Sequence, residues 1–415
     1  MKTYNWMRED WPNFTYDTHE VEAELYQYAQ EANSLAGGVS QLAEGMQYEA
    51  YIDLMVSEAL ESSAIEGEII LRDDVRSSIK NQLGLSDPKV RVTDARAEGI
   101  AALMISVRKD FSKPLTKEMI CEWHRNVLHT SDDLLGNKYR IGEWRTDKME
   151  IVSGPIGDYR VHYEAVPAEK IDEEMDRFIE WYNSKPGLNE KSMHGPVKAA
   201  IAHFWFSCIH PFDDGNGRLS RSLAEKALSQ DLGSVPLMSI SKAILNDKKS
   251  YYSELEQASG DTMDIGSWVN WFVHTTKRAQ IDAKEQVQFV LDKARFWDKF
   301  KDIGFNERQE KAIGKMFEVG TDGFTGGMNN KKYANITKCS RATAARDLVD
   351  LQNKGCLRVL GGGRSTRYEL QLGQESVFGL SVQDDTWSER AEKLKNEELS
   401  GMADMEVSKK GPGPK

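Results

Sequence analysis

The sequence predicts a mainly α-helical protein, because apolar residues recur at helical spacing along most of the chain up to residue 290. One stretch departs from this pattern: residues 145–166 carry short β-prone runs around glycines, which predicts a β-hairpin inserted among the helices. A second departure covers residues 299–370, where three short helical segments precede two β-prone runs. The predicted fold class is therefore a helical core with a small hairpin, joined to a C-terminal α+β module.

Stop signals bound the first two helical segments. We expect a helix over residues 20–35, ended by Gly37 and Gly38, because paired glycines interrupt helices. A second helix is expected over residues 40–66, with Gly67 as the glycine that follows its last turn.

Length and charge indicate several domains. The chain has 415 residues, more than one hydrophobic core usually supports, and its net charge of -12 argues against a general nucleic-acid coat. Residues 299–370 nevertheless hold 14 Lys and Arg against 8 Asp and Glu, a local positive excess. We predict a helical N-terminal region at 1–90, a core at 91–290, the α+β module at 291–372 and a disordered tail at 373–415.

Several protein classes are disfavoured. The four cysteines form no C-x-x-C pair, so we expect packed thiols rather than a disulfide framework or a zinc site. The N-terminus lacks the apolar core of a signal peptide, and no stretch approaches 18 uncharged apolar residues. We expect a soluble, cytoplasmic protein that makes no membrane contact.

The most informative stretch is residues 210–221, which read HPFDDGNGRLSR. An apolar helical stripe precedes it, and Pro211 should end that helix because proline disfavours the helical conformation in the residue before it. His210 then starts a loop, and a histidine between a rigid helix and a glycine-rich turn suits a general base. Phe212 is expected to anchor the loop in the core.

The second half of this stretch has the composition of a phosphate site. Residues 215–217, Gly-Asn-Gly, form a turn with unobstructed N–H groups, and the helical pattern resumes after it, so the turn lies at a helix N-terminus. Arg218 and Arg221 are three residues apart, share one helix face and suit a polyphosphate. Asp214 could hold a Mg²⁺ ion that bridges the phosphates.

Two other interpretations of the stretch fit less well. An EF-hand loop counted from Asp214 would place Leu219 where glycine is required, and counting from Asp213 puts glycines at two ligand positions. A helix-capping loop would explain one glycine and one aspartate, but not the histidine, the asparagine and both arginines.

Residues 210–221 resemble the motif of the Fic family, H-x-F-x-[D/E]-G-N-G-R-x-x-R, at every specified position, and the resemblance to the Fic core covers roughly residues 90–280. It implies a protein adenylyltransferase that moves AMP from ATP to a Tyr, Thr or Ser hydroxyl of a target protein. His210 would deprotonate that hydroxyl and Asp214 would hold Mg²⁺. The residues implied to bind the phosphates are Gly215, Asn216, Gly217, Arg218 and Arg221.

Two further segments resemble Fic elements. The hairpin that carries Met149, Ile151 and Val152 resembles the Fic flap, which aligns a target segment by strand addition. Tyr252 lies in a segment similar to one that lines the nucleoside pocket in the family; the alternative is an aromatic residue of the core.

Residues 62–67, SSAIEG, resemble the Fic inhibitory motif [S/T]-x-x-x-E-[G/N], which starts here at Ser62. Glu66 falls in the last turn of a helix, where the helix dipole disfavours an anion unless a cation lies nearby. The resemblance implies that Glu66 pairs with Arg221 and keeps it from the γ-phosphate. A solvated surface glutamate is the alternative, and the sequence also permits Glu66 to orient a water molecule that removes AMP.

The order of elements in residues 299–370 resembles a winged helix-turn-helix. Ser340 should cap a helix that runs to Asn353. The residues expected to face a partner are Arg341, Thr343 and Arg346 on that helix and Arg364 on the wing. DNA binding and a protein contact, with a second copy or with a substrate, both stay open because a fold does not determine function.

Three functions are compatible with the sequence. The first is an AMP transferase that Glu66 inhibits and that could also transfer AMP to itself. The second is a DNA-binding transcription regulator whose Fic core senses nucleotide. The third is a Fic enzyme that removes AMP or transfers another phosphate-linked group. A homodimer is compatible with each of them.

Overall fold

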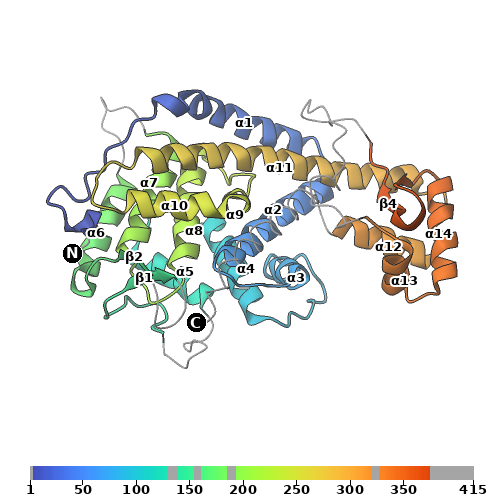
Figure 1. Cartoon of the computed structure of the whole chain (residues 1–415), viewed down its shortest axis with the longest axis horizontal. Coiled ribbons are helices and arrows are strands. Elements are labelled where there is room, and N and C mark those ends of the chain that lie inside the picture. Colours follow the sequence, from blue (N-terminus) through green and yellow to red (C-terminus); the bar gives the residue numbers. More distant parts are fainter. Residues whose placement is uncertain (1–2, 129–138, 154–159, 185–192, 319–326, 374–415) are drawn as a thin grey trace, which may run out of the picture. The chain divides into compact units, whose positions relative to one another are not determined.

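The computed structural model describes residues 3–128, 139–153, 160–184, 193–318 and 327–373. This part of the chain is mostly helical (Figure 1). It also holds two separate two-stranded antiparallel sheets, so the predicted helical fold with a small hairpin is confirmed. From residue 374 on, the predicted tail lies outside the described residues. All four cysteines are free thiols; Cys208 and Cys356 are buried, and Cys121 and Cys339 are partly exposed. No helix within the described ranges is both long enough and apolar enough to cross a bilayer.

The helices and strands follow one another in this order. The first helices are α1 (Glu22–Ser40), α2 (Glu44–Ile65), α3 (Arg72–Gln82), α4 (Ala95–Lys109) and α5 (Lys117–Val127). Next come β1 (Glu150–Ser153), β2 (Arg160–Glu164), α6 (Ile171–Asn183), α7 (Gly195–Ile209), α8 (Asn216–Leu232), α9 (Ile240–Asn246), α10 (Lys248–Ala258) and α11 (Gly266–Phe300). The last are α12 (Glu307–Glu318), α13 (Asn330–Thr337), α14 (Arg341–Asn353), β3 (Leu357–Leu360) and β4 (Arg367–Leu370).

The chain divides into two compact units. The first contains the described residues up to Gln41 and those from Gln47 to Lys284. The second contains Leu42–Met46 and the described residues from Glu285 onward. The finer division into four domains stays a prediction.

The first helix is longer than predicted. The expectation that Gly37 and Gly38 end it is wrong, since α1 runs through both and ends at Ser40. Leu35, Gly38 and Val39 are buried, so the packed face continues for another turn. Burial of that face outweighs the helix propensity lost at each glycine, about 1 kcal/mol relative to alanine.

Helices α7 and α8 carry the core of the first unit. Almost every side chain of α7 is buried, which is typical of a helix that is apolar on all sides. Neighbouring helices donate hydrogen bonds to backbone carbonyls of this pair: Trp268 to Ala200 at 2.8 Å, and Tyr182 to Leu223 at 2.9 Å. The loop that joins α7 to α8 is therefore held by a rigid, buried frame.

The predicted hairpin is present in the first unit. β1 and β2 are antiparallel, with Ile151 opposite Tyr163 and Val152 opposite Val161, and the register shifts between Ile151 and Val152. The base of the hairpin is tied to the N-terminal segment, because the Trp6 indole N–H donates to the Glu164 carbonyl at 2.7 Å. The connecting residues 154–159 lie outside the described part.

The second unit contains the expected α+β elements. Helices α12, α13 and α14 precede the antiparallel pair β3–β4, and Ser340 caps α14 by accepting the Thr343 N–H at 3.1 Å. The winged helix-turn-helix itself stays a prediction.

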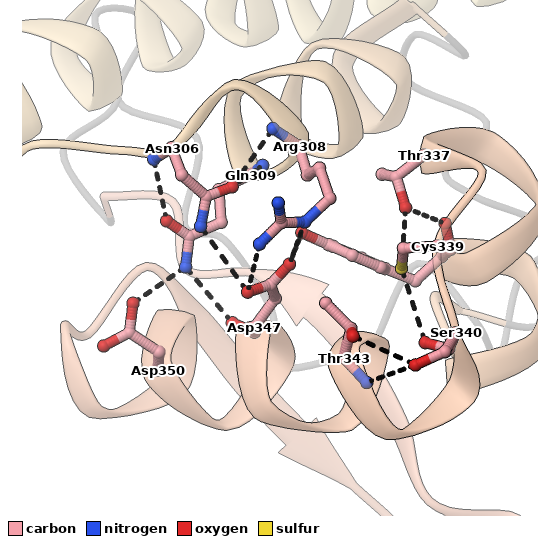
Figure 2. Close-up of polar contacts among 10 residues, drawn as sticks. Asn306, Arg308, Gln309, Thr337, Cys339, Ser340, Thr343, Asp347 and Asp350 are labelled. Carbon is pink, nitrogen blue, oxygen red and sulfur yellow. Dashed lines mark hydrogen bonds and ion pairs between the residues drawn. The ribbon is translucent and has the colours of Figure 1, made fainter.

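One buried carboxylate connects helices α12, α13 and α14 of this unit. Asp347 of α14 accepts a hydrogen bond from the Arg308 side chain of α12 at 2.9 Å (Figure 2). It accepts another from the Tyr333 hydroxyl of α13 at 3.0 Å. Burial alone would raise the pKa of Asp347, but the hydrogen bonds from these two residues leave it below its usual value. The ionised carboxylate thus fixes how α14 sits on its neighbours.

Candidate active site

The loop after α7 begins in an unusual backbone conformation. His210 has φ 52° and ψ 59°, the left-handed region that costs a non-glycine residue about 1–2 kcal/mol. Its N–H caps α7 by donating to the Phe206 carbonyl at 2.9 Å. The helix ends immediately before Pro211, as predicted, and the left-handed residue turns the chain sharply at the position of the candidate base.

The ring of His210 has one engaged nitrogen and one available nitrogen. Nδ1 lies 3.3 Å from the Ser207 carbonyl, which can only accept, so Nδ1 carries the proton and Nε2 keeps a lone pair. Burial of most of the ring lowers the pKa of His210 to about 4. The imidazole is therefore neutral at physiological pH and able to accept a proton.

Two buried side chains hold the loop from inside. Asn216 accepts the Phe212 N–H at 3.0 Å and donates to the Phe212 carbonyl at 2.8 Å, so its carboxamide bridges both ends of the turn. Phe212 is fully buried, as predicted, and its ring stacks on His124 with centroids 3.8 Å apart. The Asn216 side chain is thus committed to the loop, which leaves only its backbone N–H for the predicted phosphate contact.

His124 of α5 is a support that no sequence motif identified. Its Nδ1 accepts the Gly142 N–H at 2.8 Å, so Nε2 carries the proton and donates to the Asp214 carbonyl at 3.0 Å. Burial lowers the pKa of His124 to about 4, which favours this neutral form. The histidine therefore orients the Asp214 backbone, and a single side chain on an amphipathic helix gave no signal of that role.

Arg145 is a second residue that spacing did not identify. Its backbone N–H donates to the Pro211 carbonyl at 2.9 Å, and its guanidinium donates to the carbonyls of His210 at 2.7 Å and Asp147 at 2.7 Å. It also contacts the Val166 carbonyl beside β2. One buried guanidinium thus connects the His210 turn to the base of the hairpin.

We expect that replacing Arg145 with methionine lowers the rate of the reaction proposed below more than it weakens ATP binding. Methionine has similar length but no donors, so carbonyls at the His210 turn would be left unsatisfied at about 1–3 kcal/mol each. Thermal unfolding, kcat and KM for ATP measure the effect. An unchanged kcat at the same folded fraction would exclude a positioning role for Arg145.

The helix after the loop presents both predicted arginines at its N-terminal end. The first amide groups of α8 have no acceptor within the helix, which makes this end a natural anion site. Arg218 and Arg221 are both almost fully buried. Among the described residues, Arg218 Nε and Arg221 Nη1 are buried donors without a hydrogen-bond partner. Two guanidiniums therefore have unused N–H groups beside a helix N-terminus.

Glu66 occupies this end of α8. Its carboxylate lies 2.8 Å from Arg221 Nη2, and Ser62 holds the same guanidinium through its hydroxyl at 2.9 Å and its carbonyl at 2.8 Å. A methyl group added at Gly217 would clash with Glu66 Oε1. The carboxylate thus lies directly on the first turn of α8, paired with the arginine that the resemblance implied.

A second carboxylate faces the other arginine. Glu68 Oε1 and Oε2 both lie 3.0 Å from Arg218 Nη1. The Asp214 side chain is 48% exposed; its Oδ1 accepts the Gly215 N–H at 2.7 Å, and its Oδ2 lies 3.5 Å from Arg218 Nη2. Glu68 is outside the inhibitory motif, so sequence analysis did not select it.

The remaining predicted residues of the first unit lie around this centre. Tyr252 of α10 donates to the Ile65 carbonyl at the end of α2, at 3.3 Å. Burial, and next the nearby Glu66 charge, raise the pKa of its hydroxyl to about 12. Met149 accepts the Ala165 N–H at the base of the hairpin, and Ile151 and Val152 lie on β1, where Val152 is 46% exposed.

The predicted partner-facing residues belong to the second unit. Arg341 and Arg346 are exposed on α14, and Thr343 is half-buried there. The side chain of Arg364 lies outside what the structure describes.

Comparisons with known proteins agree with the motif. Residues 114–228 match the Fic/DOC family, and residues 4–85 match a domain of unknown function, DUF4172. The chain is 29% identical over 224 residues to Protein adenylyltransferase Fic of Aedes aegypti, an alignment that covers 52% of this chain and 39% of that protein. It is 27% identical over 228 residues to Protein adenylyltransferase Fic of Nematostella vectensis, covering 54% and 47%.

The chain thus spans less than half the length of these two curated relatives. Among solved structures, a Fic family protein from Desulfovibrio desulfuricans G20 aligns with 86% of this chain and 98% of its own, at 17% identity and a TM-score of 0.47. The loop of His210 and the start of α8 fall inside the matched residues 114–228. The Fic/DOC match is thus to residues 114–228, which hold the candidate base and both arginines.

Proposed function

We propose that this chain is a protein adenylyltransferase that moves AMP from ATP to a Tyr, Thr or Ser hydroxyl of a protein, and that Glu66 inhibits it. One observation carries the proposal: a neutral His210 starts the loop whose other end presents two arginines with unused buried N–H groups. A base and a polyphosphate site joined by one short loop suit nucleotidyl transfer. The curated relatives named above bear the same activity in their names.

In the proposed reaction, His210 Nε2 takes the proton of the target hydroxyl. The hydroxyl oxygen forms a bond to the α-phosphorus of ATP, and the bond from that phosphorus to the oxygen bridging the β-phosphate breaks. Pyrophosphate leaves with that electron pair, and AMP stays on the target. Arg218 and Arg221 would bind the β- and γ-phosphates and stabilise the charge that develops on the leaving group.

Asp214 is the residue we propose to hold Mg²⁺. Its half-exposed carboxylate can turn toward the phosphates, and Mg²⁺ often uses one or two protein carboxylates and completes its shell with phosphate oxygens and water. The bound ion would neutralise phosphate charge and orient the leaving group. His124 supports this role by fixing the Asp214 backbone.

We propose that target segments add to the edge of β1 as a further strand. Among the residues that the structure describes, β2 is the strand that pairs with β1, and Val152 is 46% exposed on β1. Arg145 links the base of this hairpin to His210, so a bound segment would be placed relative to the base.

Transfer of AMP is distinguished from other phosphate chemistry by the position of the label. The purified Glu66→Gly chain is incubated with Mg²⁺ and ATP labelled at either the α- or the γ-phosphate. Label on protein from α-labelled ATP alone supports the proposal. Label from γ-labelled ATP would indicate phosphoryl transfer, and release of AMP from a labelled protein would indicate the reverse, AMP-removing enzyme.

Arg221→Ala is expected to stay inactive, although it frees Glu66 from its partner. The substitution removes the ion pair and the proposed γ-phosphate contact together, and a lost charge-assisted contact of about 1.5–3 kcal/mol weakens ATP binding. ATP affinity and transfer rate of Arg221→Ala are compared with those of Glu66→Gly. Robust transfer by Arg221→Ala would argue against the phosphate role.

A second candidate function rests on the second unit. We propose that α12–β4 form a winged helix and that α14 is its recognition helix, because Arg341 and Arg346 are exposed on the half of α14 that Ser340 caps. The test is binding of the full chain to duplex DNA at several salt concentrations. Salt-sensitive binding that the double variant Arg341→Ala/Arg346→Ala abolishes supports a DNA-binding regulator. If the chain does not bind DNA, a contact with a protein is the remaining role for this unit.

A further inference from the structure

Two glutamates, separated by one glycine, follow helix α2. Gly67 has φ 83°, its N–H donates to the Ala64 carbonyl at 3.0 Å, and the Glu68 N–H donates to the Ser63 carbonyl at 3.0 Å. This pair of hydrogen bonds defines a Schellman cap, with glycine in the left-handed position. The cap fixes Glu68 as firmly as Glu66, because both backbones are bonded to the last turn of the helix.

The spacing of these glutamates complements the spacing of the two arginines. Arg218 and Arg221 are three residues apart on α8 and therefore lie on one face. Glu66 contacts Arg221 at 2.8 Å, and Glu68 contacts Arg218 at 3.0 Å. Arg218 also has Asp214 at 3.5 Å, but its shorter contact is the one to Glu68. The two residues that flank Gly67 thus place one carboxylate on each guanidinium of the proposed phosphate site.

We infer that Glu68 is a second inhibitory carboxylate, which holds Arg218 as Glu66 holds Arg221. This inference rests on the proposed function, since it gives Arg218 to the ATP phosphates in the active state. It differs from the inhibitory motif, which ends at Gly67 and leaves Glu68 unspecified.

Burial explains why the contact excludes a nucleotide. The side chain of Arg218 is only 4% exposed, so its charge needs an anionic partner close by, whereas Glu68 is 28% exposed and reaches it from the rim. Both carboxylate oxygens point to the same nitrogen of Arg218. A phosphate oxygen that takes this nitrogen must displace Glu68 or share a crowded, like-charged position with it.

The arrangement predicts that removing Glu66 releases only half of the inhibition. In Glu66→Gly, Arg221 is free but Glu68 still holds Arg218. Removing the Glu68 charge as well should therefore strengthen nucleotide binding further. Because Arg218 is proposed to contact phosphate and not the target, the effect should appear in ATP affinity more than in kcat.

The experiment measures the affinity of the full chain for a non-hydrolysable ATP analogue with Mg²⁺ by calorimetry. The variants are Glu68→Gln, Glu66→Gly and Glu66→Gly/Glu68→Gln. Glu98→Gln, an exposed glutamate in the first turn of α4, is the matched control. Glutamine keeps the shape of Glu68 and removes its charge, so the fold should be retained, which thermal unfolding checks.

We expect Glu68→Gln to tighten binding about three- to tenfold, in both the wild-type and the Glu66→Gly background, with no change for Glu98→Gln. The gain should vanish when Arg218 is replaced by methionine, which assigns it to this pair. Unchanged or weaker binding in Glu68→Gln would overturn the inference, even if Glu66→Gly transfers AMP. If no variant transfers AMP, the proposed function fails, and the binding data still decide whether Glu68 blocks an anion site.

Discussion

Replacing Glu66 with glycine should raise the initial rate of AMP transfer by about 10- to 100-fold at a fixed ATP concentration. The wild-type chain must break the contact between Glu66 and the buried Arg221 before that arginine can bind phosphate. A hydrogen bond to a charged group is worth about 1.5–3 kcal/mol, and each 1.36 kcal/mol is tenfold in rate. Pyrophosphate release and label on protein both report the gain.

Comparing two substitutions at Glu66 separates the effect of its charge from the effect of its side-chain length. Glu66→Gln keeps the length of the side chain and can still accept from Arg221, but it removes the negative charge. We expect it to activate less than Glu66→Gly and more than the wild-type chain. A rate for Glu66→Gly equal to that of the wild type would contradict inhibition by this residue.

Replacing His210 with alanine should lower transfer in the Glu66→Gly background by about 10²- to 10⁴-fold, the usual contribution of a positioned general base. ATP affinity should change little, because the phosphate contacts proposed above do not involve this side chain. The fold should be retained, because the cap of α7 uses the backbone N–H of residue 210 and not its ring. The control is His19→Ala, which removes an exposed histidine near the N-terminus.

The pH dependence of the active chain tests the same role. Because burial lowers the pKa of His210 to about 4, the base is already neutral well below pH 6.5, the value for an exposed histidine. The rate should therefore stay level as the pH falls from 8 to about 6 and decline only as it approaches 4. A decline centred near 6.5, or full activity of His210→Ala, would exclude this imidazole as the base.

Local patterns in the sequence predicted the helices and the loop well. Pro211 and the apolar stripe of α7 placed the end of that helix correctly, and Ser340 capped α14 as expected. The prediction that α1 ends at Gly37 and Gly38 was wrong for a tertiary reason. Because Leu35 and Val39 are buried, α1 continues past both glycines. Helix propensity is a local property, whereas tertiary packing determined where α1 ends.

The residues that position the candidate site through contacts from other elements were harder to predict. His210 and its partners lie within twelve residues, so a motif could represent them. Arg145, His124 and Glu68 act through contacts with residues 65, 90 and 150 positions away, and the first two bind backbone carbonyls that any sequence would offer. Such contacts follow from how helices and loops assemble, and no spacing along the chain encodes them.

We propose that His210 is the base for AMP transfer and that Glu66 inhibits the reaction. The most direct test incubates α-labelled ATP and Mg²⁺ with a cell lysate and one of three chains: wild type, Glu66→Gly, or Glu66→Gly/His210→Ala. We predict strong protein labelling by Glu66→Gly alone, weak labelling by the wild type and none above background by the double variant. Equal labelling by all three chains, or none by any of them, would contradict the claim.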